Sequence, residues 1–212
     1  MGAVREKSAG YITFEEYLAR SEDDCRAEWV DGRLEYLMPA SLPHQLLCKF
    51  LLMILELFVS QKQLGTVMLA PFLMRLPTRP SGREPDILFI SNARADQLRR
   101  TYLDGPADLA VEIVSPDSEE RDRRDKYDEY AVAGIPEFWL IDPDRRTAEF
   151  FVLEGAAYRP AQIDADGRFR STVLPEFWID VDWLWKRPDP LDVLRTWGIL
   201  STDWRRPGAA PR

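Results

Sequence analysis

The pattern of apolar and polar positions predicts a helix and a hairpin at the start of the chain. TFEEYL predicts a short helix, because Thr13 is a good N-cap and Glu16, three residues later, completes a capping box. RAEWVDGRLEYLM predicts a β-hairpin, since Asp31 and Gly32 form a strong turn signal between two arms of alternating apolar residues. The chain therefore opens with a short helix followed by two antiparallel strands.

Further along, apolar segments alternate with helical ones. Pro43 precedes an apolar run that predicts a helix over about 44–61, and a charged segment at 117–134 predicts another, ended by Gly134. The last two of four predicted strands flank this charged helix, which is typical of a strand–helix–strand unit. The four strands are VMLAPFLMRL, EPDILFI, DLAVEIVS and EFWLIDP.

The C-terminal third adds a hairpin and an aromatic segment. TAEFFVLE and AYRPAQID predict a hairpin or an extension of the sheet, and LPEFWIDVDWLW predicts a lid or final strand that packs on the sheet. A chain of 212 residues is in the range of one domain. We expect a single α/β domain over residues 1–188, with a peripheral tail at 189–212, where the composition becomes irregular.

Composition and charge narrow the class of protein. The net charge of -8 argues against unselective coating of nucleic acid, which needs an excess of Lys and Arg, but metal-binding carboxylates contribute to this count. Cys25 and Cys48 have no ligand spacing. The N-terminus shows no export signal, and the apolar run 46–59 is too short to cross a bilayer, so we expect a cytoplasmic protein without a membrane span.

Carboxylates on predicted strands are the first candidates for chemistry. Asp86 begins an apolar strand, where it has an equally good explanation as a residue that makes local backbone hydrogen bonds. Glu112 interrupts LAVEIVS, and a solvent-facing position would explain it. Val114 weakens that explanation, because it lies on the same face. Glu28, on the predicted hairpin, and Asp122, on the charged helix, complete the set.

The charged helix and the single histidine provide further candidates. Asp122, Lys126 and Tyr130 follow at four-residue steps, so they share one helix face. A surface ion pair with a packing tyrosine would explain them, but this helix directly follows the strand of Glu112. His44 is read first as a surface or capping residue at a helix start. One histidine cannot build a His-rich zinc site, so oxygen ligands favour Mg²⁺ or Mn²⁺.

Several motifs together resemble one family. The ordered set EWVDGRL, REPDILFI, DLAVEIVSPDS, the D-x-x-x-K-x-x-x-Y of the charged helix and GIPEFWLIDP is similar to the Uma-two family, a branch of the PD-(D/E)XK nucleases. The resemblance covers about residues 13–152. It implies an α/β fold of the restriction-endonuclease-like type, with a central mixed sheet flanked by helices. The sequence contains no GxGxxG, P-loop or GxSxG motif, so it lacks the backbone motifs of dinucleotide binding, P-loop phosphate binding and the hydrolase elbow.

The resemblance also implies roles for individual residues. Asp86, Glu112 and the backbone carbonyl of Ile113 would bind Mg²⁺ or Mn²⁺. Lys126 would act from the helix, because Val114 stands where the wider superfamily has a strand lysine. Glu28 and His44 match two further family positions and are included among the catalytic candidates. Arg121, Arg123 and Arg124 are candidates for phosphate contacts, although a charge run is usually a solvated helix face.

The expected function is metal-dependent hydrolysis of phosphodiester bonds, with DNA favoured over RNA. A homodimer would let two such sites address two strands. The alternatives are a catalytically weak or inactive nuclease-fold module that binds nucleic acid or assembles with partners, and a hydrolase of another phosphate ester.

Overall fold

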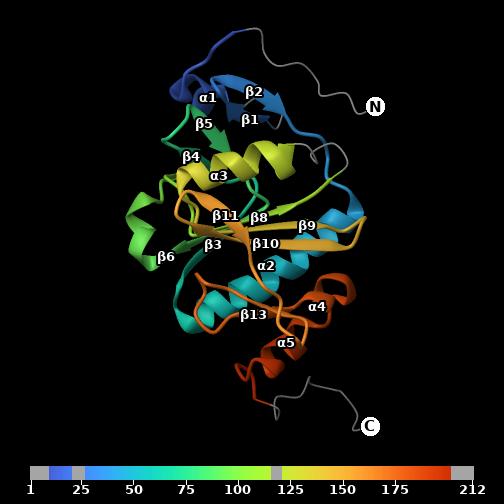
Figure 1. Cartoon of the computed structure of the whole chain (residues 1–212). Coiled ribbons are helices and arrows are strands. Elements are labelled where there is room, and N and C mark those ends of the chain that lie inside the picture. Colours follow the sequence, from blue (N-terminus) through green and yellow to red (C-terminus); the bar gives the residue numbers. More distant parts are fainter. Residues whose placement is uncertain (1–9, 21–26, 116–120, 202–212) are drawn as a thin grey trace, which may run out of the picture.

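The computed structural model describes residues 10–20, 27–115 and 121–201, whose strands form three sheets (Figure 1). The largest is a six-stranded mixed sheet with the order β11-β10-β9-β8-β6-β3. Its strands are β3 (Gly65–Leu69), β6 (Ile87–Ser91), β8 (Leu109–Ile113), β9 (Glu137–Asp142), β10 (Thr147–Glu154) and β11 (Ala157–Pro160). In this sheet β8 and β9 are parallel, as the predicted strand–helix–strand unit requires, and the other neighbours are antiparallel.

A second, five-stranded sheet with the order β2-β1-β5-β4-β7 lies beyond helix α3 (Figure 1). Its strands are β1 (Ala27–Val30), β2 (Arg33–Tyr36), β4 (Leu73–Leu76), β5 (Ser81–Arg83) and β7 (Tyr102–Asp104). The hairpin of β1 and β2 is confirmed, because Asp31 and Gly32 both adopt the positive φ angles of a tight turn. Helix α1 (Phe14–Arg20) precedes it, and Thr13 and Glu16 exchange the two hydrogen bonds of the predicted capping box.

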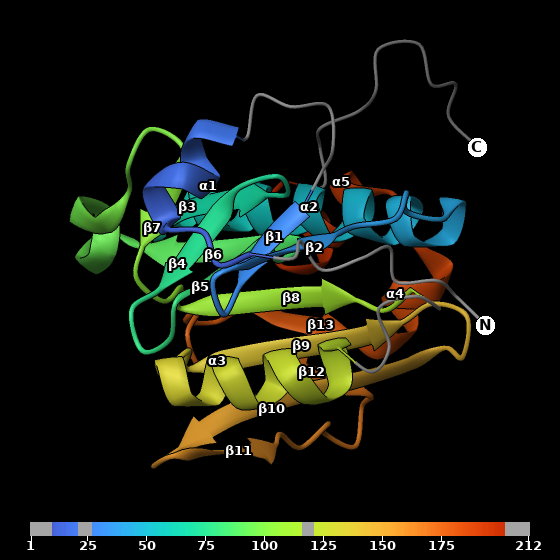
Figure 2. The same ribbon diagram turned by 90° about the horizontal axis from the view of Figure 1, so that it is seen from above.

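Two helices cover opposite faces of the six-stranded sheet (Figures 1 and 2). Helix α2 (Leu42–Lys62) buries Leu47, Leu51 and Ile54 against one face. The 3-10 helix η1 (Asn92–Gln97) follows β6. On the other face lie the π-helical turn η2 (Arg121–Lys126) and α3 (Tyr127–Ala133), which Gly134 ends in the left-handed conformation. The two cores on either side of the sheet therefore fix where α2 and α3 lie relative to β8.

Helix α2 is longer than predicted, because Ser41 rather than a later residue caps it. Its 21 residues are long and apolar enough to cross a membrane by length and composition alone. The core helix of a soluble protein can have the same length and composition, and 44% of the most apolar stretch of α2 is buried in this structure.

One prediction about the strands is wrong, and another is confirmed in part. VMLAPFLMRL forms two strands rather than one, because the chain turns at Ala70-Pro71 and places β3 and β4 in different sheets. The aromatic segment LPEFWIDVDWLW forms the last strand, the short β13 (Trp178–Asp180), paired with β12 (Arg168–Arg170), before helix α4 (Val181–Lys186), and it packs in the same core as the large sheet, as predicted. The pair β12-β13 is separate from the large sheet.

The residues after 188 begin with a packed helix. Helix α5 (Pro190–Thr196) buries Val193 in the α2 core, and Trp197 packs edge-to-face against Phe58 with ring centroids 5.3 Å apart. Residues 202–212 and Cys25 lie outside the described residues, while Cys48 is half-buried. The division into one domain and a tail remains a prediction.

Candidate active site

Strand β8 carries Glu112 into the space below helix α3. All five residues of this strand are buried, and Val111 and Ile113 face the α2 core. Ala110 and Val114 face the opposite core, which includes Tyr130. By the alternation of a strand, Glu112 lies on the face shared with Ala110 and Val114. The solvent-facing explanation for Glu112 is therefore wrong, since its side chain is only 3% exposed.

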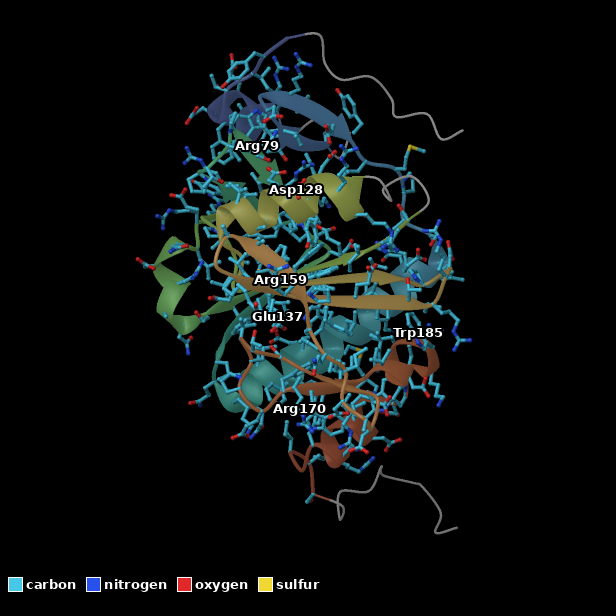
Figure 3. The ribbon with its side chains drawn as sticks, in the orientation of Figure 1. Arg79, Asp128, Glu137, Arg159, Arg170 and Trp185 are labelled. Carbon is cyan, nitrogen blue, oxygen red and sulfur yellow. The ribbon has the colours of Figure 1, made fainter. Side chains whose placement is uncertain are left out.

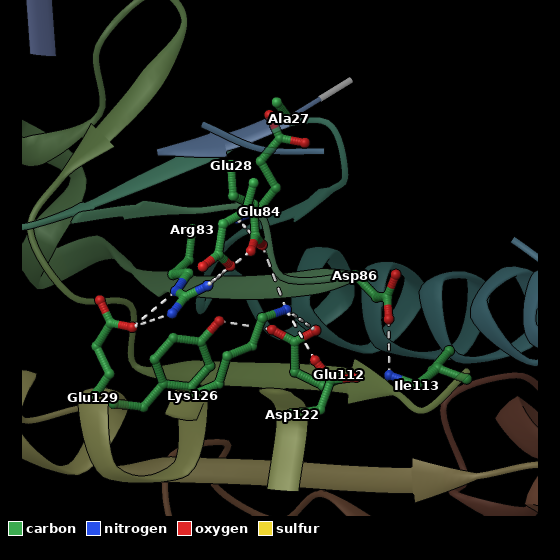
Figure 4. A network of polar contacts seen from close by, with 12 residues as sticks. Ala27, Glu28, Arg83, Glu84, Asp86, Glu112, Ile113, Asp122, Lys126 and Glu129 are labelled. Atoms are coloured by element: carbon green, nitrogen blue, oxygen red, sulfur yellow. Dashed lines mark hydrogen bonds and ion pairs between the residues drawn. The ribbon is translucent and has the colours of Figure 1, made fainter. Parts of the chain in front are cut away.

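Lys126 binds three carboxylates (Figure 4). Its Nζ lies 2.8 Å from Glu112 Oε2, 3.3 Å from Asp122 Oδ1 and 3.4 Å from Glu28 Oε1. Both Lys126 and Asp122 are buried, so a surface ion pair does not describe them. The prediction that the first turns of the helix face Glu112 is confirmed.

Tyr130 hydrogen-bonds to the second carboxylate oxygen of Glu112. Its hydroxyl donates a 2.6 Å hydrogen bond to Glu112 Oε1, so the tyrosine does more than pack on the sheet. The pKa of Glu112 is raised to about 8: burial is the largest cause, and nearby carboxylates including Asp122 and Asp86 add to it, while Lys126 lowers it. Burial, followed by the Glu112 charge, also raises the pKa of Tyr130 well above its usual value. Negative charge at this site is therefore costly without a further cation.

Arg83 forms a second centre in the same network. Its Nη1 donates to Glu28 Oε2 at 3.0 Å, and its Nε donates to Glu129 Oε2 at 2.8 Å. Burial alone would lower the pKa of Arg83, but Glu28 and Glu129 raise it above its ordinary value. Glu28 also accepts a 3.0 Å hydrogen bond from the backbone N–H of Glu84. Arg83 thereby connects β1, β5 and α3.

Sequence reasoning missed Arg83 and Glu129. They are separated by 46 positions, and β5, which carries Arg83, has only three residues and no alternation to identify it. The available signal was local: Arg83 directly precedes EPD, the segment that carries Asp86. A long cation beside a predicted carboxylate site is a reasonable candidate for an ion pair with buried acids.

Asp86 lies beside Glu112 at the start of β6. The register Ile87↔Val111, continued by one residue, places Asp86 opposite Glu112. Its Oδ2 accepts a 2.8 Å hydrogen bond from the N–H of Ile113 and lies 3.1 Å from His44 Nε2 (Figure 4 shows Asp86 and Ile113). His44 is buried, so its reading as a surface residue is wrong, and it holds Asp86 from the start of α2.

The oxygen donors suit a hard divalent cation, although the described side chains form no ready-made cluster. In the described part of the chain no group of three or more His, Cys, Asp or Glu residues is arranged to hold a metal ion. Within the described network, however, four buried carboxylates face only two buried cations, namely Glu28, Glu112, Asp122 and Glu129 against Arg83 and Lys126. A divalent cation beside Asp86, which is 17% exposed, would offset this excess.

The arginines of the charged helix differ among themselves. Arg123 forms ion pairs with Glu149 and, at 3.6 Å, with Asp142, so it ties η2 to the large sheet. Arg124 is exposed, and the side chain of Arg121 lies outside the described part of the chain. Of the three predicted phosphate contacts, Arg123 is thus already engaged with carboxylates.

Comparisons with known proteins agree with this architecture. Residues 14–182 match the model of the family Uma2, described as "Putative restriction endonuclease". The chain is also similar to a crystal structure from Anabaena variabilis described as "a putative nuclease belonging to DUF820". That comparison has a TM-score of 0.69 and 18% identity, and it covers 82% of this chain and 98% of that chain. No curated protein matches the sequence.

At this low identity, the structural likeness shows the fold alone, and the predicted restriction-endonuclease-like α/β fold is confirmed. The family match spans well over half of the 212 residues. This chain therefore belongs to the Uma2 (Uma-two) family.

Proposed function

We propose that the protein is a metal-dependent endonuclease that hydrolyses phosphodiester bonds in DNA. The observation that carries this proposal is the meeting of Asp86 and Glu112 on neighbouring strands, with the Lys126 ammonium 2.8 Å from Glu112. Two carboxylates and a lysine at one end of a mixed sheet are the groups that metal-assisted hydrolysis needs. Membership of the Uma2 family supports a nuclease role.

Asp86, Glu112 and the backbone carbonyl of Ile113 would hold Mg²⁺ or Mn²⁺. When bound, such an ion stabilises the negative charge that develops on a phosphate during hydrolysis. The protein prepares the oxygens: Asp86 is held by His44 Nε2 and by the Ile113 N–H, and Glu112 by Tyr130. These contacts restrict the carboxylate rotamers before any ligand arrives.

Lys126 supplies a buried positive charge at the same place. Its ammonium can offset negative charge on a phosphate oxygen, and it can orient a water molecule once one of the three carboxylates releases an N–H donor, but it cannot bind a metal while protonated. Glu28 accepts from Arg83 on one oxygen and lies 3.4 Å from Lys126 on the other. Glu28 therefore positions Lys126 rather than contacting the substrate.

A second candidate function is a catalytically weak or inactive module of the same fold. The observation in its favour is that Lys126 and Tyr130 already occupy both oxygens of Glu112. A metal would have to compete with these contacts. Such a module would bind nucleic acid without cutting it.

Incubation of the purified protein with supercoiled plasmid distinguishes the two candidates. The substrates are plasmid, short duplex DNA and short single-stranded DNA, each with Mg²⁺, with Mn²⁺ and with chelator. The proposal predicts nicked and linear plasmid with either ion and none with chelator. Binding without cleavage under every condition would favour the module, and cleavage that survives chelation would remove the metal from the reaction.

A further inference from the structure

A group of exposed cations lies where the turn between β9 and β10 meets helix α4. Arg145 and Arg146 are exposed on the turn, and Lys186 and Arg187 are exposed at the end of the helix. Two acidic residues on the same two segments, Asp144 and Asp182, are also exposed. On these two described segments the exposed cations therefore exceed the exposed carboxylates, although the whole chain carries a net charge of -8.

The fold holds the two segments together. The guanidinium carbon of Arg146 lies 5.9 Å from the centre of the Trp185 ring, which is a cation–π contact between the turn and α4. The charge of Arg146 also reaches Asp182 and Lys186. Figure 3 labels Trp185 on α4, on the side of the molecule where the β9–β10 turn lies. The four cations and Trp185 are called the basic rim below.

Buried Asp142 gives the turn its shape. Its Oδ1 accepts hydrogen bonds from the backbone N–H groups of Asp144, at 3.0 Å, and Arg145, at 2.9 Å. Its Oδ2 lies 3.4 Å from the Arg145 guanidinium, whose side chain is still 56% exposed. The turn therefore presents the arginine side chain at the surface, in spite of its contact with Asp142.

The basic rim adjoins the candidate active site. Strands β8 and β9 are parallel, with Ile113 paired to Ile141, and Val114 N–H donates to Ile141 O at 2.8 Å. The turn begins just after Ile141, while the Ile113 N–H holds Asp86. The carboxylates and the basic rim thus lie at the same end of neighbouring strands.

We propose that the basic rim binds the phosphate backbone of the nucleic acid and guides it to Asp86 and Glu112. This inference rests on the proposed function and names the surface that receives its substrate. Arg145 and Arg146 match phosphate oxygens by geometry and charge, and Trp185 offers a ring on which an unpaired base can stack. The position of the rim beside the carboxylates explains how a chain of negative net charge attracts a polyanion to one place.

Binding measured by fluorescence anisotropy tests the proposal without requiring cleavage. The probes are a labelled short duplex and the matching single strand, with Ca²⁺ present and at several salt concentrations. The double variant Arg145→Gln/Arg146→Gln should bind the duplex several-fold more weakly. The slope of log affinity against log salt should fall by about one per arginine that contacts a phosphate.

A matched double variant removes the same charge elsewhere. Arg100 and Arg159 are exposed; Arg100 follows η1, which comes after the end of β6, and Arg159 is on β11 (Figure 3 labels Arg159). Both lie toward the opposite end of the sheet. Arg100 does so because β6 runs antiparallel to β8. Arg159 pairs with Val152, which in turn pairs with Glu137 at the start of β9. Arg100→Gln/Arg159→Gln should keep the wild-type affinity and salt slope.

The outcomes separate this inference from the proposed function. If the wild type binds DNA through the basic rim but never cleaves it, the endonuclease proposal fails while the proposal that the rim binds DNA is supported. Equal losses of affinity in the two double variants, or unchanged binding in Arg145→Gln/Arg146→Gln, would overturn the rim even in an active nuclease. Absence of any binding to either probe would overturn it as well.

Discussion

Lys126 is surrounded by Glu112, Asp122 and Glu28, all within 3.4 Å of its ammonium and all buried. Lys126→Met removes the ammonium that contacts all three. We expect cleavage to be lost while Mn²⁺ binding persists, since the ammonium is not a ligand. The unpaired carboxylates should also lower the free energy of unfolding by about 3–5 kcal/mol without metal.

Urea unfolding with and without Mn²⁺, beside plasmid cleavage, checks both effects. Lys62→Met is the control, because Lys62 forms an ion pair with exposed Glu176 on the surface. Its stability should change by less than about 1 kcal/mol. Full cleavage by Lys126→Met would remove Lys126 from the mechanism and leave it as a structural cation.

The raised pKa of Glu112 predicts a pH dependence of metal binding. Below about pH 8 the carboxyl of Glu112 is largely protonated in the metal-free protein, so a metal must displace its proton. Mn²⁺ affinity should therefore rise with pH up to about 8, and near neutrality binding should release close to one proton. Calorimetry in buffers of different ionisation enthalpy measures this number, and an affinity independent of pH across this range would contradict it.

The same shift predicts the sign of the stability change in the metal-free protein. Between the usual pKa of 4.5 and about 8, the folded state keeps a proton on Glu112 that the unfolded state has lost. This contribution to stability is fully present below about 4.5 and is lost as pH rises through about 8. Saturating metal should reduce this loss, because it stabilises the charged form.

The ion pair between Glu129 and Arg83 of β5 ties helix α3 to the small sheet. Glu129→Gln keeps the shape of the side chain and removes its charge. We expect cleavage to fall roughly ten- to a hundred-fold, because Lys126, at the start of the same helix, loses its exact position. Mn²⁺ affinity should change little, since Glu129 is not a ligand.

Another buried carboxylate, Glu137, provides the control for Glu129→Gln. Glu137 on β9 accepts hydrogen bonds from Trp139 Nε1, at 2.8 Å, and from Thr172, outside the active-site network. Glu137→Gln should lower the melting temperature by about as much as Glu129→Gln does. It should leave the turnover of the folded protein unchanged. If both variants lose cleavage in proportion to stability, the link through Arg83 is structural only.

The sequence predicted the elements that carry their own local signal. The capping box of Thr13 and Glu16 and the turn at Asp31-Gly32 are encoded within a few residues, and the structure has both. The buried carboxylate Glu112 was identified because it interrupts an apolar strand. Lys126 required a resemblance to a family, since four-residue spacing alone equally describes a surface pair.

What the sequence did not predict depends on tertiary contacts. The pairing of Arg83 with Glu129 joins residues 46 positions apart, and no local pattern reports such a distance. The split of VMLAPFLMRL follows from the assignment of β3 and β4 to different sheets, which periodicity cannot distinguish from one long strand. Helix α5 was missed because its stability comes from packing on α2 rather than from its own short sequence.

For the whole molecule, bound metal should stabilise the fold. A ligand that binds only the folded state raises the melting temperature by mass action. At a concentration one hundred times its dissociation constant, it adds about 2.7 kcal/mol to the free energy of unfolding. Mg²⁺, Mn²⁺ and Ca²⁺ should each shift the melting curve, and Ca²⁺ should support little turnover because its loose geometry positions water poorly. A melting temperature unaffected by millimolar concentrations of all three ions would favour the inactive module.

The plasmid cleavage assay of Asp86→Ala and Glu112→Ala, beside the wild type and Glu137→Gln, tests the central claim most directly. If Asp86 and Glu112 hold the ion, each alanine variant should remain folded and lose Mg²⁺- and Mn²⁺-dependent cleavage, because too few oxygens remain to bind the ion. The wild type and Glu137→Gln should cleave the plasmid. Wild-type cleavage by either alanine variant would contradict the account and place the reaction elsewhere in the protein.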